Sequence, residues 1–227
     1  MKKSINMYLT KGNITEQNVD CIVNAANMHL RPGSGVCGAI YKKAGFDNLK
    51  AETDTLGPVP VGCSVLSGSY DLETEGIKGI IHTVGPIYED GLRGEAALLA
   101  SAYQSALQTA RMNGFKSIAF PCISTGVYKY PRKNAAALAV ATVANFLQTY
   151  PDGFEVVFVA FETEDYDYLK EALENYIVWS KTLIESGIID ETDIEIVAIP
   201  AAPTLGDGKD SGTKGSTGSS DEILNSI

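Results

Sequence analysis

The sequence predicts a three-layer α/β/α sandwich whose central sheet is mixed in direction but mostly parallel. From Met1 to about Trp179, short apolar runs alternate with longer stretches of helical spacing, a pattern typical of a sheet covered by helices. Several runs are apolar almost throughout, as expected for strands buried on both faces of a parallel sheet. With 227 residues, 44% of them hydrophobic, the chain can bury a sizeable core without disulfides or a structural metal.

Six segments have the length and apolar pattern of strands. They are residues 5–10, 20–24, 62–67, 79–84, 117–123 and 155–161. Four segments carry apolar residues at helical spacing, and one of them opens with proline, which suits a first helical turn. These helices are expected at residues 36–44, 94–113, 131–150 and 165–179.

The predicted domain covers residues 1–179, and residues 180–227 form an acidic C-terminal extension. Residues 180–199 could add a short helix and a short strand. Residues 201–220 are rich in Gly, Ser, Thr, Asp and Pro, so they have almost nothing to bury, and we expect the extension to be largely flexible.

Composition narrows the classes of function. The net charge is −10, without the basic stripe of a general nucleic-acid binder, so an anionic ligand would depend on local backbone dipoles. The chain opens with charged residues and no apolar stretch, and nowhere does it reach the roughly 20 apolar residues of a membrane span. We therefore expect a cytoplasmic protein. Four widely spaced cysteines and two histidines predict no metal site.

The first candidate site lies where an apolar run ends in Asn24 and Asn27, before Gly33, Gly35 and a helix that starts at Val36. Ligands of doubly wound sheets bind where strand ends meet helix N-termini. A loop of small residues lets backbone N–H groups approach an anion, and Asn side chains suit sugar hydroxyls. Alternatively, the glycines only shape a turn that the Asn residues cap.

A second junction repeats this design. The apolar run 117–123 leads into Ser124, Gly126 and Tyr128 before the helix that opens at Pro131. Two such loops can hold both phosphates of a diphosphate. Tyr128 would form a flat wall for a sugar ring, although a tyrosine at such a position is also common on an ordinary surface.

At these residues the chain resembles the macrodomain family over roughly residues 5–178. Four stretches match its signatures in order and spacing: Asn-Ala-Ala-Asn at 24–27, Gly-Ser-Gly-Val-Cys-Gly-Ala-Ile at 33–40, Ile-His-Thr-Val-Gly-Pro at 81–86 and Ile-Ser-Thr-Gly-Val-Tyr at 123–128. The resemblance implies the macrodomain fold and ADP-ribose binding. It also implies a set of ligand-binding residues: Asn13, Ile14, Asn24, Asn27, Gly33, Ser34, Gly35, Val36, Cys37, Ser124, Thr125, Gly126, Val127, Tyr128 and Phe161.

The resemblance also implies roles for single residues of the site. Asn13 stands where the family has an Asp that binds the adenine amino group, and its amide oxygen can still accept a hydrogen bond. Phe161 matches the aromatic residue that packs on adenine. Asn27 matches the residue that binds the distal ribose and takes part in hydrolysis, so Asn27 and Gly35 are the expected catalytic residues.

Cys37 departs from the pattern of MacroD-type hydrolases, which usually have Asp at this position. Here the loop is similar to that of alphavirus macrodomains, which also have Cys and include members that remove mono-ADP-ribose from proteins. The alternative, in which Cys37 only packs the helix, stays open.

The leading hypothesis is therefore an ADP-ribosyl hydrolase that acts at the distal ribose of mono-ADP-ribosylated proteins. The matched positions lack the carboxylate pair of a glycosidase, so a diphosphate oxygen of the ligand would hold the attacking water while Asn27 fixes the ribose. A non-catalytic ADP-ribose reader is the alternative, and an ADP-ribose 1″-phosphate phosphatase is a third. We expect a monomer that needs no cofactor and binds neither membrane nor nucleic acid.

Overall fold

The computed structural model describes residues 4–188 together with residues 195 and 196. Its seven strands form one sheet in the order β3-β4-β2-β5-β6-β1-β7, in which β3 and β4 pair antiparallel and all other neighbours pair in parallel. This is the mixed, mostly parallel sheet that the sequence predicted. The strands are β1 (Ser4–Lys11), β2 (Cys21–Ala26), β3 (Ser64–Ser67), β4 (Gly79–Val84), β5 (Ser117–Phe120), β6 (Glu155–Ala160) and β7 (Glu195–Ile196).

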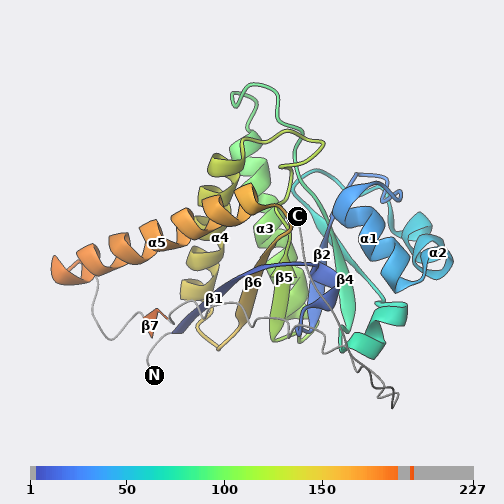
Figure 1. The fold of residues 1–227 in the computed structure, drawn as a ribbon, viewed down its shortest axis with the longest axis horizontal. Helices are drawn as coiled ribbons and strands as arrows, with labels where there is room; N and C mark the ends of the chain where they lie inside the picture. The colour runs from blue at the N-terminus through green and yellow to red at the C-terminus, as the bar shows by residue number, and fades with distance from the viewer. Residues whose placement is uncertain (1–3, 189–194, 197–227) are drawn as a thin grey trace, which may run out of the picture.

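Helices cover both faces of the sheet (Figure 1). They are α1 (Gly35–Ala44), α2 (Phe46–Leu56), α3 (Glu95–Met112), α4 (Arg132–Thr149) and α5 (Thr163–Glu185), with short 3-10 turns η1 (Ile14–Glu16) and η2 (Tyr70–Glu75). Strand residues alternate between two cores: Cys21 and Val23 pack with α3, α4 and α5, whereas Ile22 packs with α1 and α2. The period of two in a strand produces this division, and the three-layer prediction is confirmed.

Several boundaries differ from the prediction for local reasons. β5 ends at Phe120 because Pro121 has no N–H to donate to the sheet. β3 begins at Ser64, after a turn in which Gly62 has φ of +84°. Helix α2 was missed, since its sequence is largely polar and buries only Leu49 and Thr53.

The C-terminal part also differs. α5 continues to Glu185, so the expected domain boundary at residue 179 lies within a helix. β7 pairs in parallel with β1 and is the short strand that residues 180–199 could add. The segment expected to be flexible, residues 201–220, lies outside the described residues. Within the described ranges, the structure contains no helix with the length and apolarity that a membrane crossing requires.

Candidate functional site

A cavity of about 660 Å³ opens where the parallel strands β1, β2, β5 and β6 end. In α/β proteins this edge of the sheet collects the loops that lead into helix N-termini. Both glycine-containing loops predicted from the sequence line the cavity. The predicted site residues found in its lining are Asn13, Ile14, Asn27, Gly33, Ser34, Gly35, Val36, Cys37, Ser124, Thr125, Gly126, Val127, Tyr128 and Phe161.

The first loop continues directly into the first turn of α1. The backbone N–H groups of Gly35, Val36 and Cys37 have no hydrogen-bond partner among the described residues, as helix geometry dictates for a first turn. Ser34, the N-cap residue, does not cap them with its side chain. These N–H groups, together with the helix dipole, make this end of α1 suitable for an anion.

Glycine is required where this loop packs against α1. A Cβ on Gly38 would lie 2.7 Å from the carbonyl oxygen of Gly33, closer than a side chain can approach a backbone atom. Gly35 has φ of +61°, a left-handed conformation that glycine adopts without steric cost. The loop therefore lies close to the helix, and its backbone, not its side chains, forms this wall of the cavity.

The second loop, which follows β5, is closed by its own backbone. The N–H of Lys129 donates to the carbonyl of Gly126 at 3.0 Å, and the N–H of Tyr130 donates to that of Ser124 at 2.9 Å. In contrast, the N–H groups of Gly126, Val127 and Tyr128 have no partner in the described part of the chain. The loop thus offers a second set of unused donors to the same cavity.

Ser124 has an unusual conformation within this loop. Its φ is +68°, which is rare for a residue with a side chain. Its side chain is 7% exposed, and its hydroxyl has no hydrogen-bond partner in the part of the chain that the structure describes. Strain and an unsatisfied polar group in one buried residue are both costs, and such costs concentrate at functional sites.

Asn27 lies at the cavity wall, and its carboxamide also organises the chain around it. The oxygen accepts from the N–H of His29 at 3.1 Å and from that of Arg31 at 3.2 Å. The Asn27 Nδ2 group donates to the carbonyl of Arg31 at 2.8 Å, which leaves its second N–H for a ligand.

Asn13 is the N-cap of η1. Its side-chain oxygen accepts from the backbone N–H of Thr15 at 3.1 Å and from the hydroxyl of the same residue at 3.0 Å. Both lone pairs of this oxygen are therefore in use. The predicted hydrogen bond to an adenine amino group would have to compete with these two donors.

Asn24 does not line the cavity, so the prediction that it contacts a ligand needs correction. Its side chain is 1% exposed and lies in β2 opposite His82 of β4. The Nδ2 group of Asn24 is 3.0 Å from His82 Nδ1, and His82 Nε2 is 2.8 Å from the hydroxyl of Ser67. Within β2 the side chain of Asn24 lies on the same face as that of Ile22, two residues earlier, and this is the face of the sheet that α1 covers.

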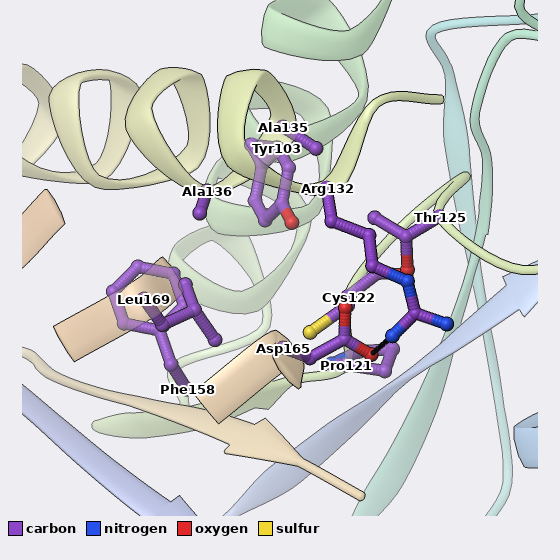
Figure 2. A pocket seen from close by; sticks show the side chains of 10 residues that line it. All are labelled: Tyr103, Pro121, Cys122, Thr125, Arg132, Ala135, Ala136, Phe158, Asp165 and Leu169. Carbon is purple, nitrogen blue, oxygen red and sulfur yellow. Dashed lines mark hydrogen bonds and ion pairs between the residues drawn. The ribbon is translucent and has the colours of Figure 1, made fainter. Parts of the chain in front are cut away.

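Charged residues that sequence reasoning missed lie at the β6 side of the cavity. Arg132, at the start of α4, forms an ion pair with Asp165 in the first turn of α5, with 3.0 Å between Nη1 and Oδ2 (Figure 2). Burial raises the pKa of Asp165, and Arg132 opposes this rise. Glu162 and Gly85 also line the cavity. Charges in the first turns of two helices that follow strand ends were the available signal in the sequence.

A small hollow of about 10 Å³, roughly the size of one water, lies beside this ion pair. Figure 2 shows Tyr103, Phe158 and Leu169 on its apolar side and Thr125 beside Arg132. Arg132 and Asp165 line both this hollow and the large cavity, so the two spaces adjoin at the ion pair.

A family model described as Macro domain matches residues 23–139 of this chain. The chain belongs to the macro domain family. Among curated relatives, the O-acetyl-ADP-ribose deacetylase of Klebsiella pneumoniae (strain 342) is 45% identical over 168 residues, which cover 73% of this chain and 94% of the relative. The protein of the same name from Escherichia fergusonii is 42% identical over 162 residues, which cover 70% of this chain and 90% of the relative.

Solved macrodomain structures share the fold. The Oceanobacillus iheyensis macrodomain with ADP has a TM-score of 0.69 and 38% identity, and the match covers 79% of this chain and 97% of that one. The Trypanosoma brucei macrodomain in complex with ADP-ribose has a TM-score of 0.67 and 33% identity, with coverage of 74% and 69%. Both matches support the macro domain assignment.

Cys37 in this macro domain is a buried thiol, 5% exposed, that packs with Ile40 and Tyr41. Burial raises the pKa of Cys37, and hydrogen bonds from the Gly33 backbone and the Asn24 side chain only partly oppose the rise. A thiol with a raised pKa stays protonated and is a poor nucleophile. The burial of Cys37 favours the alternative in which this side chain packs at the base of the first loop.

Phe161 is 76% exposed at the mouth of the cavity, directly after β6. Stacking of a base on an aromatic ring contributes about 1–3 kcal/mol. We expect Phe161→Ala to weaken ADP-ribose binding about tenfold and to leave the melting temperature unchanged, since the ring is mostly in solvent. Isothermal titration calorimetry measures the affinity. Met112→Ala, at an 86% exposed residue of α3, is the control, and equal affinities for both variants would contradict the prediction.

Proposed function

We propose that this chain binds ADP-ribose in the 660 Å³ cavity and hydrolyses derivatives of it at the distal ribose. The observation that carries the proposal is that two loops with unpaired backbone N–H groups line one cavity. Such donors suit the two phosphates of a diphosphate. An exposed aromatic ring at one end provides a surface for a base.

The order of the strands assigns the two ends of the ligand. Phe161 and Asn13 follow β6 and β1, whereas Asn27 and the first loop follow β2. Adenine would therefore lie on the β1 and β6 side, and the distal ribose near Asn27 and Gly35. The diphosphate would span the N–H groups of α1 and of the second loop.

The carboxylates of the cavity are on the adenine side of this arrangement. Among the described lining residues they are Glu162 and Asp165, and Asp165 is paired with Arg132. A diphosphate oxygen of the ligand would then hold the water, and Asn27 would fix the ribose, so catalysis would come mainly from positioning. For an acetyl ester, water adds to the carbonyl carbon and the ribose hydroxyl leaves, which yields acetate and ADP-ribose.

Two substrates follow from this proposal. The names of the curated relatives support O-acetyl-ADP-ribose, and the alphavirus-like first loop supports mono-ADP-ribose on proteins. Incubation with each substrate and measurement of released acetate or ADP-ribose tests both. Tight binding without release of either product would instead favour a reader, the alternative that the lack of a carboxylate at the first loop supports.

Asn27→Ala tests the proposed chemistry. We expect hydrolysis to fall on the order of a hundredfold, because a misplaced reacting group costs about that factor, while ADP-ribose binding is retained. The variant also loses the three hydrogen bonds of the carboxamide, so its melting temperature is measured alongside. Asn113→Ala, which removes one exposed side-chain hydrogen bond to the backbone, is the control. Unchanged turnover would exclude Asn27 from the reaction.

We further propose that the protein acts as a cytoplasmic monomer on ADP-ribose attached to proteins, without a cofactor. Four free cysteines are compatible with a reducing compartment. Residues 1–179 would carry the site, since every lining residue lies between Gly12 and Asp165. Size-exclusion chromatography with light scattering tests the monomer.

A further inference from the structure

Glu95, the first residue of α3, has its carboxylate buried under the chain that precedes the helix. The side chain is 3% exposed. Its Oε1 atom accepts from the backbone N–H groups of Glu89, Asp90 and Gly91 at 3.2, 3.4 and 3.2 Å, and Oε2 accepts from that of Arg93 at 2.7 Å. Four donors on one carboxylate give segment 86–94 a defined shape, although it has no regular secondary structure.

The electrostatics agree with this geometry. Backbone hydrogen bonds, first that of Glu95 itself and then those of residues 89, 93 and 90, lower the pKa of Glu95 to about 2. The carboxylate is therefore charged throughout the physiological range. Hydrogen bonds to a charged acceptor are stronger than neutral ones, so the segment depends on this one side chain.

Segment 86–94 packs against the second loop of the cavity. The N–H of Tyr88 donates to the carbonyl of Tyr128 at 2.9 Å. The rings of Tyr88 and Tyr130 meet edge to face, with 5.0 Å between centroids. Gly85, just before the segment, lines the cavity itself. The segment thus lies against the loop and contacts it through both the backbone and the ring of Tyr88.

The Tyr88–Tyr128 bond bears on the donors that the loop offers. The bonds from Lys129 to Gly126 and from Tyr130 to Ser124 close the loop internally. The bond from Tyr88 adds an external constraint on the peptide after Tyr128. With that carbonyl held by Tyr88, the neighbouring peptides have less freedom to rotate, and their unpaired N–H groups keep their directions.

We propose that Glu95 is a positioning residue for the diphosphate-binding loop, acting through segment 86–94 and Tyr88. This inference rests on the proposed function, because it assigns the unpaired N–H groups of Gly126, Val127 and Tyr128 to phosphate. A purely structural role, in which Glu95 only stabilises the start of α3 through the helix dipole, would affect stability but not selectively the affinity for phosphates.

The test compares Glu95→Gln with Glu89→Gln. Each change removes one negative charge, but the Glu89 side chain is exposed, and among the described residues its one ion pair is with Arg93. A Gln at position 95 keeps one acceptor and replaces the other oxygen with an NH₂ group that repels the N–H of Arg93. The affinities for ADP-ribose and for adenosine, which lacks phosphates, are measured together with hydrogen exchange at the Tyr88 amide.

For Glu95→Gln we expect about tenfold weaker ADP-ribose binding, unchanged adenosine binding and faster exchange of the Tyr88 amide, with no change for Glu89→Gln. If Glu95→Gln does not fold, Glu95→Asp is measured in its place. It keeps the charge on a shorter side chain, and its loss of ADP-ribose affinity should be less than about tenfold. Equal losses for both ligands, no loss, or unfolding of both variants would overturn the inference. If the unchanged protein bound no ADP-ribose, the proposed function itself would fail. If the unchanged protein bound ADP-ribose but Glu95→Gln showed no selective loss, only the inference about Glu95 would fail.

Discussion

Replacing Gly85 with alanine should reduce ADP-ribose affinity on the order of a hundredfold and lower stability by about 1–3 kcal/mol. A Cβ at this position would lie 2.3 Å from Ser124 Oγ and 2.6 Å from Ile123 Cγ2. Ile123 is 1% exposed and cannot move aside, so the backbone of β4 or of the second loop has to shift. Gly85 and the second loop both line the cavity, and the shift therefore changes the position of the phosphate donors.

Gly68→Ala is the matched control, because an added Cβ there meets neighbours only at 3.6 Å or more and Gly68 does not line the cavity. Calorimetric titration with ADP-ribose and urea unfolding measure the two effects. Normal affinity of Gly85→Ala would show that the close approach of β4 and the second loop is not needed for binding.

Lowering the pH from 7 to 5 should cost the protein about 2 kcal/mol of unfolding free energy through His82. The imidazole is completely buried, and desolvation lowers the pKa of His82 to about 4. The unfolded chain binds a proton near pH 6.5, whereas the folded chain does so only near pH 4, so stability falls as the pH drops through this window. Each unit of pKa difference is worth about 1.4 kcal/mol.

The neighbours of His82 explain why it stays neutral. The Nδ2 group of Asn24 has only protons to offer, so Nδ1 of His82 must accept, and Nε2–H must donate to Ser67. Tyr41 of α1 approaches the ring at 6.4 Å between centroids, and no charged side chain contacts the ring among the described residues. Protonation at Nδ1 would place two donors against each other in an apolar layer.

Urea unfolding at pH 7, 6 and 5 measures this effect, and His82→Asn supplies the comparison. The variant is less stable at every pH, but its stability should depend less on pH, by about 2 kcal/mol across the interval. The lowered carboxyl pKa values of Asp20, Asp152 and Glu95 remove stability mainly below this interval. Parallel pH profiles for the two proteins would show that His82 does not cause the loss.

The sequence predicted the loops of the cavity well because their function resides in the backbone. Glycines and small residues after strand ends signal close approach of peptide groups, and the residues in 33–37 and 124–128 all line one cavity. The sequence placed Asn24 at the end of its strand, but β2 continues to Ala26, so Asn24 lies inside the strand and its side chain is buried on the same face as Ile22.

Other features had a weak local signal or none. The charges of Arg132 and Asp165 in the first turns of two helices were visible in the sequence, but their pairing joins helices that are distant in sequence. The Glu95 carboxylate accepts from four backbone N–H groups of segment 86–94. Residues of any type carry such groups, so composition cannot reveal this contact. Helix α2 was hidden because it buries only a narrow stripe of its surface.

The position of β1 has a consequence for synthesis on the ribosome. In the described structure, the first strand of the chain pairs only with β6 and β7, which are made after most of the protein. Until Glu155–Ala160 has emerged, β1 has no partner in the sheet and the wall of the cavity formed by Phe161 does not exist. The sheet is therefore completed late in synthesis, because the two strands that pair, β1 and β6, are far apart in sequence. Capture of ribosome-stalled chains of increasing length on an ADP-ribose matrix would show the length at which the binding site forms.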